Sequence, residues 1–159
     1  MAGKAKPIPE GYHTITPSLT VCDCAKALDF YKKAFGAEER MRADGPDGKI
    51  MHAEITIGDS IVMVNDEFPE QGAVAPSTIG GTPVGLWIYT KDVDADYKRA
   101  VDAGATTDME PDDMFWGDRM CALRDPFGHK WTLATHVEDV SLEEMAKRQK
   151  AAMEEWASA

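Results

Sequence analysis

The stretch that decides the fold runs from Leu19 to Ala37 and reads LTVCDCAKALDFYKKAFGA. A short β-branched run leads into Asp23, a residue type that often accepts a hydrogen bond at the start of a helix. The apolar residues that follow recur at helical spacing. Gly36 stands just after them, where the left-handed end of a helix favours glycine. The stretch therefore predicts a strand and then a helix over residues 24–35.

The neighbouring residues complete a unit of one strand, one helix and three further strands. Residues 12–21 alternate between apolar and small polar side chains, which indicates a strand with one apolar face, Ile15 included. After the helix, a short strand is expected over residues 38–42. Two more are expected over residues 50–57 and 60–64, joined by a turn at Gly58-Asp59. The order of elements over residues 12–66 is βαβββ.

The same order recurs after a connection over residues 67–83. A strand is expected over residues 84–90, and a helix begins at Asp92 and ends before Gly104, as the first helix ends before Gly36. Strands over residues 106–109, 119–124 and 130–135 follow, with a loop over residues 110–118 and a turn over residues 125–129. Residues 84–136 thus form a second βαβββ module.

Two such modules predict an α+β fold in which a cupped mixed sheet surrounds a cavity. A βαβββ unit leaves one face of its sheet bare, so two copies are expected to cover a shared cavity. We expect residues 1–11 to be a flexible lead-in and residues 12–136 to be a single domain. Residues 137–159 are expected to carry a C-terminal helix, because Ser141 and Glu144 form a capping box.

Composition limits the partners of the chain. Its 159 residues include 28 acidic and 17 basic side chains, so the formal net charge of −11 disfavours nucleic acid and anionic lipid. No apolar run is long enough to span a membrane, and the first residues lack the apolar segment of a secretory signal. Three cysteines, an odd number, favour reduced thiols in a cytoplasmic protein.

Four stretches resemble the vicinal oxygen chelate superfamily, which includes glyoxalase I, extradiol dioxygenases and bleomycin-resistance proteins. They are residues 19–37, 58–66, 92–105 and 125–131. With residues 115–119 they are most similar to its small PhnB-like branch, and the likeness covers about residues 12–136. Singly these motifs are weak; their combination is specific. The resemblance implies the paired βαβββ fold, and also a homodimer, since family members often pair.

Enzymes of that superfamily hold a divalent metal with one side chain from each of four strands, and the metal polarises oxygens of the substrate. Carried over by the resemblance, the four positions are Thr16, Met63, Gly85 and Thr132. None offers an imidazole or a carboxylate, the groups that a catalytic divalent ion prefers. We therefore expect neither a metal site nor another cofactor.

A displaced metal site or an acid–base pair remains an alternative. His52 and Glu54 share one face of their expected strand and are the weak catalytic candidates of the chain. A simpler interpretation is that His52 is a polar residue bonded to a neighbouring strand.

The alternation of the strands predicts which side chains face the cavity. The expected ligand-binding residues are Thr16, Met63, Trp87, Tyr89 and Thr132. Two large aromatic rings with nearby hydroxyl groups suit a planar or amphipathic organic ligand, although the rings would also suit simple filling of the cavity.

The segment from Met114 to Arg119 is a second candidate for ligand contact. Trp116 is expected to cover the cavity and Arg119 to bind an anionic group. The alternative is that Asp118 and Arg119 order the loop while its aromatic residues cover a sheet edge.

Two classes of function follow from these residues. The first is metal-free binding or sequestration of a small organic molecule. The second is a lyase, isomerase or dioxygenase with a non-standard metal site. The small number of titratable side chains on the expected cavity face favours binding. An adaptor that binds another protein is a third class, for which no specific residue argues.

Overall fold

The computed structural model describes residues 5–158. Residues 1–4 of the expected lead-in and residue 159 of the expected C-terminal helix lie outside the described residues, as do the side chains of Trp156 and Ser158. The first module contains β1 (Ser18–Val21), α1 (Cys24–Phe35), β2 (Glu38–Asp44), a 3₁₀ turn (Pro46–Gly48), β3 (Ile50–Ile57) and β4 (Ser60–Asp66).

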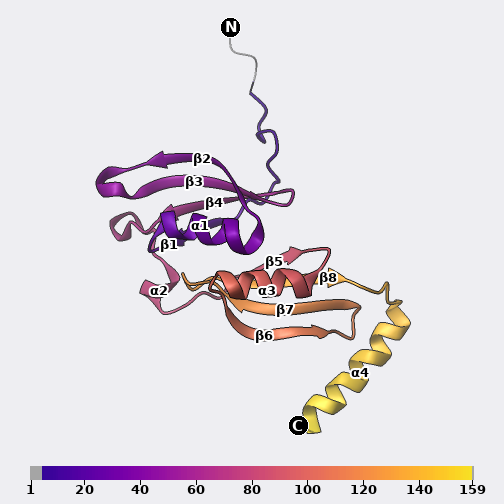
Figure 1. Cartoon of the computed structure of the whole chain (residues 1–159). Coiled ribbons are helices and arrows are strands. Elements are labelled where there is room, and N and C mark those ends of the chain that lie inside the picture. The colour runs from indigo at the N-terminus through magenta and orange to yellow at the C-terminus, as the bar shows by residue number, and fades with distance from the viewer. Residues whose placement is uncertain (1–4, 159) are drawn as a thin grey trace.

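The connection between the modules carries a 3₁₀ turn (Pro69–Gln71) and the short helix α2 (Pro76–Ile79). The second module contains β5 (Gly85–Tyr89), α3 (Val93–Ala103), β6 (Thr106–Asp113), β7 (Asp118–Arg124) and β8 (Lys130–His136). The helix α4 (Leu142–Ser158) follows and extends away from the two modules (Figure 1). The predicted order βαβββ is confirmed in both modules.

Each module forms its own four-stranded mixed sheet, in the orders β1-β4-β3-β2 and β5-β8-β7-β6. The first strand of each module runs parallel to the last, and the other pairs are antiparallel. The helices α1 and α3 lie on the same side of the molecule and pack against each other, which places the two sheets next to one another (Figure 1). The opposite face of the second sheet leaves Trp87 and Tyr89 exposed.

An aromatic core joins the modules. The rings of Phe30, Tyr31 and Phe35 on α1 contact Phe127 and Trp131 of the second module, with 4.6 Å between the ring centroids of Phe35 and Trp131. Tyr31 and Trp131 are almost fully buried, at 0% and 2% exposure. Burial of so much aromatic surface helps to hold the modules together.

The signals at both ends of the two long module helices are confirmed. The side chains of Asp23 and Asp92 each accept a hydrogen bond from the backbone N–H three residues later. Gly36 and Gly104 end the helices in the left-handed conformation. The equivalent caps support the assignment of α1 and α3 to equivalent positions in the two modules.

Two strand boundaries differ from the sequence-based expectation by four residues or more, and several others differ by one or two residues. The strand expected from residue 12 begins only at Ser18, and Ile15, expected on the apolar face, is 84% exposed. Pro17 offers its carbonyl but no N–H to β4, so the ladder starts there. The loop expected from residue 110 is also shorter, because β6 continues to Asp113 as an edge strand that pairs only with β7. An edge strand tolerates Pro111 and many charges, since one side needs no partner.

The three cysteines are unpaired. Cys22 is exposed, whereas burial raises the pKa of Cys24 to about 12 and that of Cys121 to about 11. In residues 5–158, no helix has both the length and the apolar character needed to cross a membrane.

Candidate functional site

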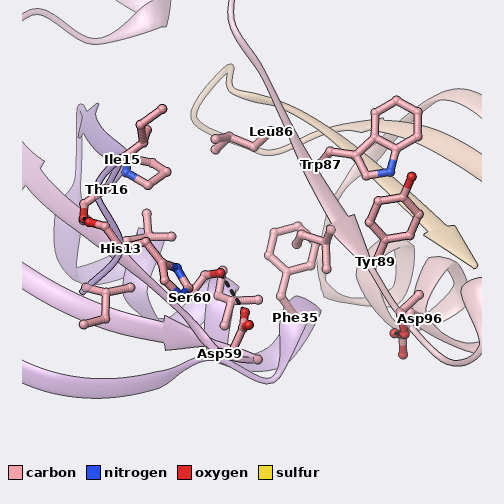
Figure 2. A pocket seen from close by; sticks show the side chains of 17 residues that line it. His13, Ile15, Thr16, Phe35, Asp59, Ser60, Leu86, Trp87, Tyr89 and Asp96 are labelled. Carbon is pink, nitrogen blue, oxygen red and sulfur yellow. Dashed lines mark hydrogen bonds between the residues drawn. The ribbon is translucent and has the colours of Figure 1, made fainter. Parts of the chain in front are cut away.

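A cavity of about 650 Å³ lies between the two modules. One wall comes from His13 and residues 15–17, which lead into β1, and from the turn between β3 and β4. The other wall comes from residues 86–89 of β5 and from Thr90, which follows the strand. Figure 2 shows Phe35, from the end of α1, between these walls. The volume falls in the range of about 300–1,000 Å³ that small-molecule sites occupy.

Two neighbouring aromatic rings define the β5 wall. Trp87 and Tyr89 are 48% and 65% exposed, and their ring centroids lie 6.1 Å apart at an interplanar angle of 38° (Figure 2). Side chains two apart on a strand point to the same face, which explains why the rings stand together. Large apolar rings left this exposed form a surface suited to stacking with a ligand.

The cavity mixes apolar and hydroxyl groups. Thr16, predicted to contact a ligand, lines it, and its hydroxyl donates to the carbonyl of His13 at 3.2 Å. Asp59 and Ser60 lie at the β3–β4 turn, where the serine hydroxyl donates to the aspartate carboxylate at 2.9 Å (Figure 2). The site therefore offers a few oriented polar groups around an apolar centre, as small-molecule sites commonly do.

Two other predicted contacts lie beside this cavity. Met63 lines a smaller pocket of about 340 Å³ that it shares with Thr16 and the lead-in residues. Thr132 is half-buried and stands opposite Trp87 in the β5–β8 register, which puts the two side chains on the same sheet face. The structure thus brings Thr16, Trp87 and Tyr89 into one cavity, with Met63 and Thr132 next to it.

Trp116 belongs to a cluster around one buried carboxylate, which sequence reasoning did not identify. Asp118 is 4% exposed; its Oδ2 accepts hydrogen bonds from the hydroxyl of Tyr89 at 3.1 Å and from the indole N–H of Trp116 at 3.2 Å. Its Oδ1 lies 2.7 Å from Nδ1 of His136, whose Nε2 lies 3.0 Å from Asp139. Both contacts raise the pKa of His136 above its usual value, and the contact with Asp118 has the larger effect.

Gly117 fixes the backbone of this loop. Its φ of +97° lies in the region that favours glycine, and an added Cβ would come within 2.1 Å of the carbonyl oxygen of Glu138. The Gly117 carbonyl accepts hydrogen bonds from the backbone N–H groups of Val137 and Glu138. The loop that carries Trp116 is therefore held against the segment that leads to α4.

Arg119 lies on the other side of the sheet, next to α3. Its guanidinium bonds both carboxylate oxygens of Asp94 at 2.8 Å and Asp113 at 3.2 Å. These bonds raise the pKa of Arg119, and the bonds to Asp94 have the largest effect. The same bonds lower the pKa of Asp94. The predicted contact of Arg119 with an anionic ligand stays a prediction. The Arg119 side chain points away from Trp116, which bonds Asp118 on the opposite face of the sheet.

His52 and Glu54, the weak catalytic candidates, are in contact. The Glu54 carboxylate accepts a hydrogen bond from the Tyr12 hydroxyl, lies 3.3 Å from Nε2 of His52, and pairs with Arg40 at 3.3 Å. These contacts lower the pKa of Glu54, and the hydrogen bond from Tyr12 has the largest effect. Burial acts in the opposite direction and raises the pKa, but by less. A carboxylate with these three partners is a weak proton acceptor and is well suited to anchoring the lead-in to β3.

In the described part of the chain, no group of three or more His, Cys, Asp or Glu side chains lies close enough together to hold a metal ion, at His52 and Glu54 or elsewhere. The positions carried over by resemblance, Thr16, Met63, Gly85 and Thr132, also lack imidazole and carboxylate. The residues present therefore do not fit the four-ligand metal site of the enzymes to which the chain is similar.

Comparison with known proteins gives one family, relatives in sequence and similar solved structures. The model of the Glyoxalase/Bleomycin resistance protein/Dioxygenase superfamily matches residues 12–133. An uncharacterised protein of Mycobacterium tuberculosis is 44% identical over 134 residues, which cover 82% of this chain and 79% of the relative. An uncharacterised protein of Mycobacterium bovis has the same identity, with 88% of its length covered.

Two examples come from the similar solved structures that are more than 25% identical to this chain. TioX from Micromonospora is 28% identical, with a TM-score of 0.64 over 79% of this chain and 99% of that one. TnmS3, an antibiotic binding protein from Streptomyces, is 27% identical, with a TM-score of 0.60 over 78% of this chain and 95% of that one.

The family match covers both modules and the cavity between them. The fold agrees with it, because the similar solved structures share that fold. The chain belongs to the Glyoxalase/Bleomycin resistance protein/Dioxygenase superfamily.

Proposed function

We propose that this protein binds a planar or amphipathic organic molecule in the cavity between its modules and sequesters it without a metal. The observation that carries the proposal is the exposed pair Trp87 and Tyr89 on one wall of a cavity of about 650 Å³. The similarity to TnmS3, an antibiotic binding protein, supports a small organic molecule as the ligand. Thr16 supplies a hydroxyl group on the opposite wall.

A binding screen tests this proposal. Isothermal titration calorimetry against a panel of aromatic antibiotics and aromatic metabolites should give at least one saturable ligand with a stoichiometry near one per cavity. Replacing Trp87 by alanine should weaken that ligand about fivefold or more, because a stacked aromatic pair contributes beyond its buried area. The matched control is Leu142→Ala, since Leu142 is 90% exposed at the start of α4 and outside the cavity lining.

Two outcomes would contradict the proposal. If every saturable ligand binds the Trp87→Ala protein as tightly as the wild type, the cavity is not the binding site. If the purified protein contains stoichiometric divalent metal that His52→Ala removes, the metal-dependent lyase, isomerase or dioxygenase expected as the alternative becomes the better description. Inductively coupled plasma mass spectrometry without added metal measures this.

We also propose that the binding form is a homodimer in the cytoplasm and that the chain falls in the PhnB-like branch of its superfamily. The membership in this superfamily supports the dimer, since family members often pair. Analytical ultracentrifugation at several protein concentrations tests the oligomeric state, and a monomer at every concentration would contradict it.

A further inference from the structure

Two buried aspartates in this chain bind the same pair of side-chain types. Asp125, in the turn between β7 and β8, is 4% exposed, and its Oδ2 accepts hydrogen bonds from the hydroxyl of Tyr31 at 2.8 Å and from the indole N–H of Trp131 at 2.9 Å. Both rings belong to the aromatic core between the modules. The buried carboxylate there fixes rings that are already packed on every side.

Asp118 repeats this arrangement in another setting. It is also 4% exposed, and its Oδ2 also accepts from one tyrosine hydroxyl and one indole N–H, those of Tyr89 and Trp116. Here, however, the rings face outward. Tyr89 is 65% exposed and Trp116 is half-buried, compared with 0% for Tyr31 and 2% for Trp131.

The difference in exposure needs a physical reason. Burying a carboxylate is unfavourable and is offset by the hydrogen bonds that it accepts. Around Asp125 the fixed rings also gain packing contacts with the core. Around Asp118 each ring contacts one other aromatic ring, Tyr89 with Trp87 and Trp116 with Phe115, and much of the Tyr89 ring stays in solvent. Folding therefore gains less from holding these rings in one orientation. Rings held rigid and exposed bind a partner with a smaller loss of side-chain entropy.

We propose that Asp118 is a positioning residue that holds Tyr89 and Trp116 as a preformed wall for a planar, conjugated ligand. The inference rests on the proposed binding function and states how the site achieves it. The phenol hydroxyl and the indole N–H are both committed to Asp118, so the rings offer a ligand their π faces and not their polar ends. Trp87, 6.1 Å from Tyr89 between ring centroids, continues the wall into the cavity. Recognition is therefore by stacking and shape.

The contact between Asp118 and His136 provides a readout that does not depend on any ligand. Because the pKa of His136 is raised first by Asp118 and then by Asp139, neutralising Asp118 should lower it. Titration of the imidazole signals by NMR in the Asp118→Asn protein therefore shows whether the carboxylate occupies the place described. The indole N–H signal of Trp116, assigned with a Trp116→Phe variant, should shift in the same protein.

The experiment uses acridine, a planar aromatic compound that is uncharged at mildly alkaline pH, and measures its affinity by isothermal titration calorimetry. The wild-type protein should bind it. Asp118→Asn should bind about tenfold more weakly, since the ligand must then order two side chains that the carboxylate had held. The matched control is Asp125→Asn, which removes the same kind of carboxylate from the core. It should lower thermal stability and leave the affinity for acridine within about twofold of the wild type.

A second matched pair keeps the test decisive if Asp118→Asn does not fold. Tyr89→Phe keeps the ring and removes its hydrogen bond to Asp118, so the affinity should fall about threefold. Tyr31→Phe makes the same change at Asp125 and should not alter the affinity.

The possible failures are distinct. If wild type binds acridine and both Asp118→Asn and Tyr89→Phe bind it equally well, the positioning role is wrong and the proposed function stands. If the wild type binds other compounds of the screen but not acridine, the ligand class stated here is wrong. If no compound of any kind binds, the proposed function fails as well.

Discussion

At the level of single residues, His136 links the stability of the fold to pH. Its folded-state pKa is raised by Asp118 and Asp139, so the contacts favour the protonated ring. A raised pKa stabilises the folded state fully below the ordinary value of 6.5, and this contribution is lost as the pH rises through the folded-state value. The wild type should therefore be more stable than His136→Asn in mild acid, and the difference should shrink towards alkaline pH.

Urea unfolding of both proteins at a series of pH values measures this difference. A gap that is constant, or that widens as the pH rises, would show that the contacts do not favour the protonated ring. The carboxylates need to stay ionised throughout, so the series is best kept above the range in which aspartates titrate.

Residues 118 and 119 also show why the candidate site was only partly predictable. Sequence reasoning paired Asp118 with Arg119 as an alternative, because the two are adjacent and oppositely charged. In the structure both lie on β7, where successive side chains point to opposite faces. Arg119 reaches Asp94 on α3, while Asp118 bonds Tyr89 and Trp116 on the other face. The expected start of the strand at Arg119, one residue late, hid this alternation.

At the level of elements, the two helix caps should make similar contributions. Asp23 and Asp92 each accept one backbone hydrogen bond at the start of α1 and α3. Replacement of either by alanine leaves that N–H without its partner and should lower the free energy of unfolding by about 1 kcal/mol. Replacement of either by serine should restore most of the loss, because serine is also a favourable cap.

Chemical denaturation of the four variants tests this prediction. A loss at only one position would mean that the two helices are not equivalent in the way their caps suggest. A loss that serine does not restore would point to the charge, and not to the hydrogen bond, as the stabilising feature.

Elements set by local signals were predicted well, and those set by distant contacts were not. The caps and the glycines at residues 36 and 104 mark α1 and α3 directly in the sequence. The first strand was predicted to start too early because residues 12–17 alternate in polarity as a strand does. In the structure these residues have no partner strand, apart from the hydrogen bond that the Pro17 carbonyl accepts from β4. The extension of β6 to Asp113 depends on pairing with β7, which composition does not reveal.

At the level of the whole molecule, the aromatic core between the modules should make them unfold together. Phe35 on α1 is 9% exposed and packs on Trp131 of the second module. Phe35→Ala should lower the free energy of unfolding by about 3 to 5 kcal/mol, because it removes a large buried ring and leaves a cavity. Far-UV circular dichroism and tryptophan fluorescence should still report one coincident transition.

Two separated transitions, in the wild type or the variant, would show that the modules are independent units. The sequence predicted both modules and a cavity between them. It did not predict that α1 packs on α3 or that Tyr31 reaches Asp125, since these contacts join residues far apart in the chain.

The unequal exposure of the three cysteines has a practical consequence. Cys22 is open to solvent, while Cys24 and Cys121 are buried thiols of raised pKa. A maleimide dye or a thiol-reactive sensor chip should therefore attach at one place on each native molecule. Every immobilised copy would then have the same orientation, which makes surface-based ligand screening of this protein feasible without an engineered tag.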